Sequence, residues 1–352
     1  MALFRMTTLV FGLSLTAAHA QEVGFSTFNI DSTESGRNLQ IAIWYPALPD
    51  GKSVNVGDNR VFTGTPSSLN ATPTKGRFPL VLLSHGSGGN VQAAGWLATK
   101  LVKAGFVVAG PNHPGTTSGD STPESTSKIW QRTGDISALI DYLDSNKQWA
   151  KSVDKERIGI VGFSLGGATA MELAGAQANL EAFARFCDDH NQWGCAWLAG
   201  GVGYKNGERI KVEKVDLRAV DKDRFEQSNL DSRIKSAVLI DPGFAVAFDE
   251  KSLRSIAIPM SFINLGDAGK IPPAVIADRL ATLTPHGTYA TIAGADHFSF
   301  LPVCKDGASE FLKAAGEFDP ICDEAKRPRA EIQQDIATLV NQALANTLQS
   351  RK

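Results

Sequence analysis

A serine lies at the centre of Gly162-Phe-Ser164-Leu-Gly166, the Gly-x-Ser-x-Gly pattern of a nucleophile elbow. An apolar run at residues 158–161 precedes it and small residues follow it, so we expect a buried strand, a sharp turn and a helix. The flanking glycines, which have no Cβ, leave room for such a turn. The pattern predicts that Ser164 is a nucleophile; the alternative is a surface serine in a glycine-rich turn.

A serine hydroxyl reacts well only when a base removes its proton, and histidine is the usual base. His297 lies in Gly294-Ala-Asp-His-Phe298, after the last predicted strand and before the final helices. It follows Ser164 in the chain, as the base of an α/β nucleophile elbow does. We therefore predict that His297 is the base. His113 follows an earlier strand, and we expect it to line the substrate pocket.

An acid that orients the histidine should follow a strand between Ser164 and His297. Asp241 ends the predicted strand at residues 235–240, and Asp267 follows the next strand. Topology alone favours Asp267, since the later strand is the commoner position. Asp296 is too close to His297 in sequence to turn toward it, and we expect it to shape the loop.

A glycine-rich segment, His85-Gly-Ser87-Gly-Gly89, follows the predicted strand at residues 79–84. Such a loop can bring backbone N–H groups close to a developing oxyanion. We predict that the N–H groups of Ser87 and of Leu165, the residue after the nucleophile, are these donors. His85 is assigned a structural role.

The order of the predicted elements indicates a doubly wound, mostly parallel α/β sheet. Short apolar runs typical of buried parallel strands alternate with segments of helical period. An antiparallel, half-buried strand is expected at residues 39–45 and a loop at 50–77. The further strands are expected at residues 79–84, 106–110, 157–161, 235–240, 259–264 and 288–293, and the helices at 91–104, 128–150, 272–283 and 328–348.

One segment, about residues 178–232, departs from this alternation and is expected to be an insertion over the carboxyl ends of the strands. It is either a lid or substrate wall, or a solvated surface excursion. Four cysteines are present, and their proximity in sequence favours the pairs Cys187 with Cys195 and Cys304 with Cys322. An even number of cysteines indicates disulfides in an exported protein.

The first twenty residues have the features of a secretory signal peptide. Arg5 precedes an apolar run at residues 6–15, and Ala18-His-Ala20 resembles a cleavage site. We expect a single domain at residues 21–352 that is secreted or periplasmic after cleavage near Ala20. No later run is long and apolar enough for stable membrane insertion. The net charge of −2 argues against a nucleic-acid partner.

Several motifs together resemble the α/β-hydrolase superfamily, and most closely its dienelactone-hydrolase-like group, which includes the platelet-activating-factor acetylhydrolases. They are Trp44-Tyr-Pro, Ser84-His-Gly-Ser-Gly, Gly162-Phe-Ser-Leu-Gly-Gly-Ala-Thr and Val238-Leu-Ile-Asp-Pro-Gly-Phe. In the acetylhydrolases the acid follows the strand before the usual one, so the resemblance implies Asp241 rather than Asp267. It also implies that the residue at the position of Ser87 donates an oxyanion N–H.

The chain departs from this group at two positions. Phe163, a candidate pocket residue, stands where the acetylhydrolases tend to have histidine, and Ser164 stands where true dienelactone hydrolases use cysteine. The expected function is hydrolysis of small carboxylic esters through an acyl-enzyme, without a metal or cofactor. The alternatives are a thioesterase, amidase or peptidase with the same catalytic residues, or a binding protein that has lost activity.

Overall fold

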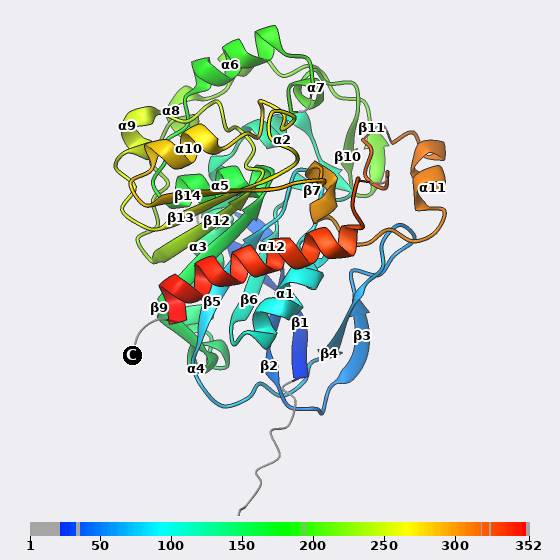
Figure 1. Cartoon of the computed structure of the whole chain (residues 1–352), viewed down its shortest axis with the longest axis vertical. Coiled ribbons are helices and arrows are strands. Elements are labelled where there is room, and N and C mark those ends of the chain that lie inside the picture. The colour runs from blue at the N-terminus through cyan, green and yellow to red at the C-terminus, as the bar shows by residue number, and fades with distance from the viewer. Residues whose placement is uncertain (1–21, 33–35, 193, 318, 324, 350–352) are drawn as a thin grey trace, which may run out of the picture.

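The structure is a computed structural model that describes residues 22–32, 36–192, 194–317, 319–323 and 325–349. The expected signal peptide, residues 1–20, lies outside them. The main sheet has ten strands in the order β14-β13-β12-β9-β5-β6-β2-β1-β4-β3 (Figure 1). The strands from β14 to β6 pair in parallel, and β2 pairs antiparallel with β6 and β1. The predicted mostly parallel α/β class is confirmed.

Each of the six parallel strands begins or ends within two residues of the boundary predicted for it. Their short apolar sequences are buried because helices cover both faces of the sheet. These strands are β5 (Phe78–Ser84), β6 (Val107–Asn112), β9 (Val153–Phe163), β12 (Ile234–Ile240), β13 (Met260–Leu265) and β14 (Gly287–Ile292).

The N-terminal part of the sheet differs from the prediction. Residues 50–77 are not only a loop, because they contain β3 (Lys52–Val56) and β4 (Thr65–Leu69). β3 is the edge strand of the sheet and β4 lies between it and β1, and pairing holds these polar sequences although they have no continuous apolar face. β1 (Glu22–Ser32), which was not predicted, pairs with β2 (Arg37–Ala47) along its whole length. β2 is buried on both faces from Ile41 onward, not on one, because it lies inside the sheet.

Helices form a layer on each face of the sheet. α1 (Gly95–Lys103) and α12 (Arg329–Leu344) pack on one face of the sheet, where they lie side by side (Figure 1). α3 (Trp130–Ser145) and α5 (Leu165–Leu173) pack on the other. The helix expected at residues 272–283 is shorter and spans Asp278–Leu283 (α10). The other helices outside the 178–232 segment are α2 (Pro123–Ser127), α4 (Trp149–Ser152), α9 (Glu250–Leu253) and α11 (Ala308–Ala314). The 3-10 turns span Val91–Ala94 and His297–Phe300, and a π-helical turn spans Ala345–Gln349.

The segment at 178–232 is partly ordered into secondary structure. It contains α6 (Leu180–Asp189), α7 (Gly194–Leu198), β10 (Gly203–Lys205), β11 (Glu208–Ile210), a 3-10 turn (Leu217–Ala219) and α8 (Lys222–Phe225). β10 pairs with β8 (Asp120–Ser121), which with β7 (Thr116–Thr117) forms a hairpin just beyond the carboxyl end of β6. The segment therefore reaches the carboxyl edge of the sheet, and α6 and α7 lie at the end of the molecule opposite β3 and β4 (Figure 1).

Both predicted disulfides are present, Cys187 with Cys195 and Cys304 with Cys322. Such bonds persist in oxidising compartments and are rare in the cytosol. They are consistent with a chain that folds in an oxidising environment. Within the described ranges, no helix has the length and apolar character needed to cross a membrane.

Candidate active site

Ser164 stands at a strained turn between β9 and α5. Its φ is 54°, which is uncommon for a residue with a side chain and typical of a functional elbow. The turn requires its glycines: a Cβ on Gly162 would lie 2.1 Å from the Gly166 carbonyl oxygen, and one on Gly166 would lie 1.9 Å from the Ser84 oxygen. Ser164 is partly exposed, so its hydroxyl is presented at the surface of the turn.

His297 begins the 3-10 turn that follows β14. Its Nε2 lies 3.2 Å from Ser164 Oγ and its Nδ1 lies 2.9 Å from Asp241 Oδ2. Because an ionised carboxylate only accepts hydrogen bonds, Nδ1 carries the proton and Nε2 accepts from the serine. The ring of Phe163 lies against that of His297, with 4.8 Å between centroids. Phe163 thus packs beside the base. Asp296 forms a capping box with Ser299, the loop-shaping role expected for it.

Asp241 is fully buried, and both of its carboxylate oxygens accept hydrogen bonds. Oδ2 accepts from His297, and Oδ1 accepts from Asn264 Nδ2 at 2.7 Å and from the Leu265 N–H at 2.8 Å. These bonds fix the carboxylate. Asn264 was not predicted to have a role, although a carboxamide inside the apolar strand β13 signals a buried polar partner.

Asp267, the alternative acid, is held elsewhere. Its Oδ1 accepts from the Gly294 N–H at 2.9 Å, and its Oδ2 bonds to Lys326, which lowers the pKa of this carboxyl. The structure therefore places Asp241, and not Asp267, at His297 Nδ1.

The two predicted oxyanion donors come from segments on either side of Ser164. Leu165 opens α5, where the first N–H groups have no acceptor inside the helix. Ser87 lies in the exposed tip of the glycine-rich loop. The neighbouring Gly86 passes so close that a Cβ on it would lie 3.2 Å from Ser164 Cβ. The loop and the helix start thus meet at the nucleophile.

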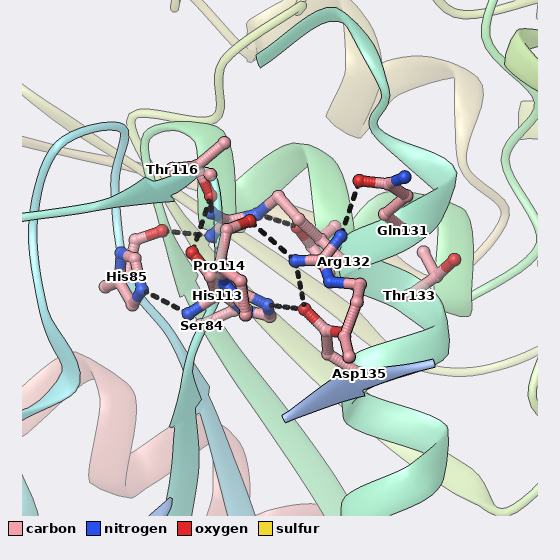
Figure 2. Close-up of polar contacts among 12 residues, drawn as sticks. Ser84, His85, His113, Pro114, Thr116, Gln131, Arg132, Thr133 and Asp135 are labelled. Atoms are coloured by element: carbon pink, nitrogen blue, oxygen red, sulfur yellow. Dashed lines mark hydrogen bonds and ion pairs between the residues drawn. The ribbon is translucent and has the colours of Figure 1, made fainter. Parts of the chain in front are cut away.

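His113, predicted to line the pocket, is instead fully buried. Its Nε2 bonds to Ser84 Oγ at 3.0 Å and its Nδ1 to Asp135 Oδ2 at 2.8 Å (Figure 2). Its backbone N–H donates to His85 Nε2, and His85 Nδ1 bonds to the Gly86 oxygen. Both histidines therefore belong to a polar network beneath the glycine-rich loop, which fits the structural role predicted for His85.

Burial, reinforced by the charge of Arg132, lowers the pKa of His85 from its ordinary value of 6.5 to about 3. The unfolded chain thus binds a proton that the folded protein excludes, so the stability from neutral His85 is present above pH 6.5 and lost below it. The quantity to compare is the unfolding free energy of the wild type minus that of His85→Asn. We expect this difference to fall by about 1.4 kcal/mol for each pH unit from pH 6.5 toward pH 4. Urea unfolding at several pH values measures it; a flat difference would contradict it.

A cleft of about 920 Å³ lies between the 178–232 segment and the stretch from β8 to the start of α3, and Lys205, Val212 and Trp130 are among the residues that line it. Neither Ser164 nor His297 does. Phe183 of α6 packs on Phe244, three residues after Asp241, with 4.3 Å between ring centroids. The segment is thus anchored beside the loop that bears Asp241. Among the described residues, no group of three or more histidine, cysteine, aspartate or glutamate side chains could hold a metal ion.

The solved structure of an esterase agrees with this fold. A ferulic acid esterase from Streptomyces cinnamoneus has a TM-score of 0.60 at 16% identity, covering 96% of this chain and 93% of that one. A puromycin-hydrolysing peptidase from Mycobacterium tuberculosis has a TM-score of 0.48 at 12% identity, covering 92% and 39%. The fold and the elbow define an α/β-hydrolase.

Residues 67–192 match the model of the dienelactone hydrolase family, and this stretch includes Ser164 and the glycine-rich loop. The chain therefore resembles the dienelactone-hydrolase-like group of α/β-hydrolases, and the match supports a hydrolase. The uncharacterized protein YcjY of Escherichia coli (strain K12) is 38% identical over 93 residues. That match spans only 26% of this chain and 28% of the relative.

Proposed function

We propose that the protein is an exported serine esterase that hydrolyses small carboxylic esters through an acyl-enzyme. The observation that carries the proposal is the hydrogen-bonded series from Ser164 Oγ through His297 to the buried Asp241. A serine, a histidine and a carboxylate in this relation are the groups that acyl transfer requires. The match to a hydrolase family and the fold shared with an esterase support it.

The first half-reaction forms the acyl-enzyme. Ser164 Oγ attacks the ester carbonyl while His297 Nε2 takes the hydroxyl proton, and Asp241 stabilises the imidazolium. The N–H groups of Ser87 and Leu165 bind the oxyanion of the tetrahedral intermediate. When the intermediate collapses, the bond to the alcohol oxygen breaks and His297 returns the proton to it.

The second half-reaction regenerates the enzyme. A water molecule loses its proton to His297 Nε2 and attacks the acyl carbon, and the Ser164 oxygen leaves and recovers that proton. Every proton is carried by His297, so the scheme requires no cofactor or metal. The partner is a small-molecule ester, and neither nucleic acid nor stable membrane insertion takes part. The two disulfides support secretion or export to the periplasm.

A substrate panel tests this proposal. We expect the mature protein, without the signal peptide, to hydrolyse p-nitrophenyl acetate and butyrate faster than matched thioesters and p-nitroanilides. Faster cleavage of a thioester or an anilide would replace the esterase by a thioesterase or an amidase. No turnover of any member would favour the inactive binding protein.

A further inference from the structure

We propose that Arg132 is a positioning residue that holds the glycine-rich loop and the start of α5 in register, so that the N–H groups of Ser87 and Leu165 converge on one oxyanion. This inference rests on the proposed esterase function. It assigns a role to a side chain that lies behind the site and does not reach the substrate, because Arg132 is only 1% exposed.

Arg132 projects from α3 and uses all three guanidinium nitrogens (Figure 2). Nη2 donates to the His85 carbonyl oxygen and to Ser84 Oγ. Nη1 donates to Thr116 Oγ1 at 2.6 Å, and Nε donates to Thr169 Oγ1 at 3.0 Å. One planar side chain thus joins the end of β5, the strand β7 and the helix α5 that follows the nucleophile.

The glycine-rich loop is tied to Arg132 at two points. The first is the His85 carbonyl, one residue before Gly86, which lies against Ser164. The second runs through Thr116, whose carbonyl oxygen accepts from the Gly88 N–H at 2.9 Å. Ser87 lies between these two points, so Arg132 restricts the segment that presents its N–H.

The nucleophile helix is tied through Thr169. The hydroxyl that accepts from Arg132 Nε also donates to the Leu165 carbonyl oxygen at 3.2 Å. The Leu165 carbonyl, on the residue that also bears the oxyanion N–H, is therefore linked through Thr169 to the guanidinium that binds the His85 carbonyl. Because Gly166 and the Ser84 carbonyl are in close contact, a shift of either segment would move both oxyanion donors.

The buried charges around Arg132 also favour an oxyanion. Arg37 Nη2 pairs with Asp135 Oδ2 at 3.0 Å, and His113 links that carboxylate to Ser84, so the network contains two guanidinium groups and one carboxylate. Burial lowers the pKa of Arg132 to about 9 and raises that of Asp135 to about 7, which leaves Arg132 charged at neutral pH. The network thus has excess positive charge beneath the loop that faces the developing negative charge.

Ser84, His113 and Asp135 form a hydrogen-bonded series of the same residue types as the active site. It is not a second nucleophilic site, because all three side chains are buried. Arg132 Nη2 donates to Ser84 Oγ, which directs the serine proton to His113 Nε2. The series therefore fixes Ser84 as an acceptor for Arg132.

The test compares Arg132→Lys with Arg233→Lys. Arg233 also binds α3, through Asp141, but on the exposed side. Lysine keeps the charge and loses the fork that bonds several acceptors at once.

We expect Arg132→Lys to lower kcat for p-nitrophenyl acetate by about 30-fold, less than loss of an oxyanion donor itself, with KM nearly unchanged. Affinity for an alkyl boronic acid, which forms a tetrahedral adduct on serine, should fall by a similar factor. Arg233→Lys should keep both values within about twofold.

Thr169→Val provides a second measurement if Arg132→Lys does not fold. It removes the bond between Arg132 and α5 with little change in shape, and we expect a fall in kcat of about fivefold with a matching loss of boronate affinity. The inference is overturned if folded variants keep wild-type kcat, or if kcat falls while boronate affinity does not. Ser164→Ala separates this failure from that of the esterase proposal: an inactive Ser164→Ala beside a fully active Arg132→Lys would refute only the role of Arg132.

Discussion

Replacing Ser164 by alanine is expected to lower kcat for p-nitrophenyl acetate by about 10⁶-fold, to the level left by binding and the oxyanion donors alone. The variant removes the atom that forms the acyl bond, so His297 has no proton to transfer. Alanine at this position keeps the turn, because the elbow is shaped by its glycines and by the backbone. Circular dichroism and thermal unfolding should therefore match the wild type.

The matched control for this variant is Ser145→Ala, which removes an exposed hydroxyl at the end of α3. We expect its kcat and KM to equal those of the wild type. Equal activity in Ser164→Ala and the wild type would mean that another residue is the nucleophile.

The second large effect is expected for Asp241→Asn, with a loss in kcat of about 10⁴-fold. In the wild type, Oδ1 accepts from Asn264 and from the Leu265 N–H. The only oxygen of an asparagine must take that place, which turns its NH₂ group toward His297 Nδ1. The imidazole must then accept at Nδ1 and carry its proton on Nε2, so it cannot accept the proton of Ser164.

The comparison variant is Asp267→Asn. In the wild type, the Asp267 carboxylate pairs with Lys326 and accepts from the Gly294 N–H, away from His297. We therefore expect kcat of the variant within about threefold of the wild type. Steady-state kinetics of the two variants decide between the two acids. Thermal unfolding checks that the variants are equally stable. A large loss only in Asp267→Asn would reverse the assignment of Asp241.

The parts of the fold that the sequence predicts well are those in which one local signal dominates. The continuous apolar runs of β5, β9 and β12 indicate buried parallel strands wherever they occur. The polar strands β3 and β4 have no such signal. They pair with each other, and β4 also pairs with β1, which lies much earlier in the chain. A loop is therefore the natural prediction for residues 50–77, and it is wrong for residues 52–56 and 65–69.

The candidate site follows the same rule. The sequence predicts Ser164 and His297 as partners because a local motif and chain order identify them. The choice between Asp241 and Asp267 depended on which loop turns toward His297, which neither spacing nor composition determines. The roles of Asn264 and Arg132 were missed, because they arise only when β12, β13, α3 and α5 come together. Their buried polar side chains were the available signals.

The central claim, that Ser164 is the nucleophile of an acyl-transfer site, is tested most directly by covalent labelling. The mature wild-type protein is treated with a fluorophosphonate, which reacts with serines activated by a neighbouring base. Intact mass and peptide mapping then locate the adduct. We expect one adduct per chain, on Ser164, absent in Ser164→Ala and formed far more slowly in His297→Ala. An adduct on another residue, or no adduct on an active enzyme, would contradict it.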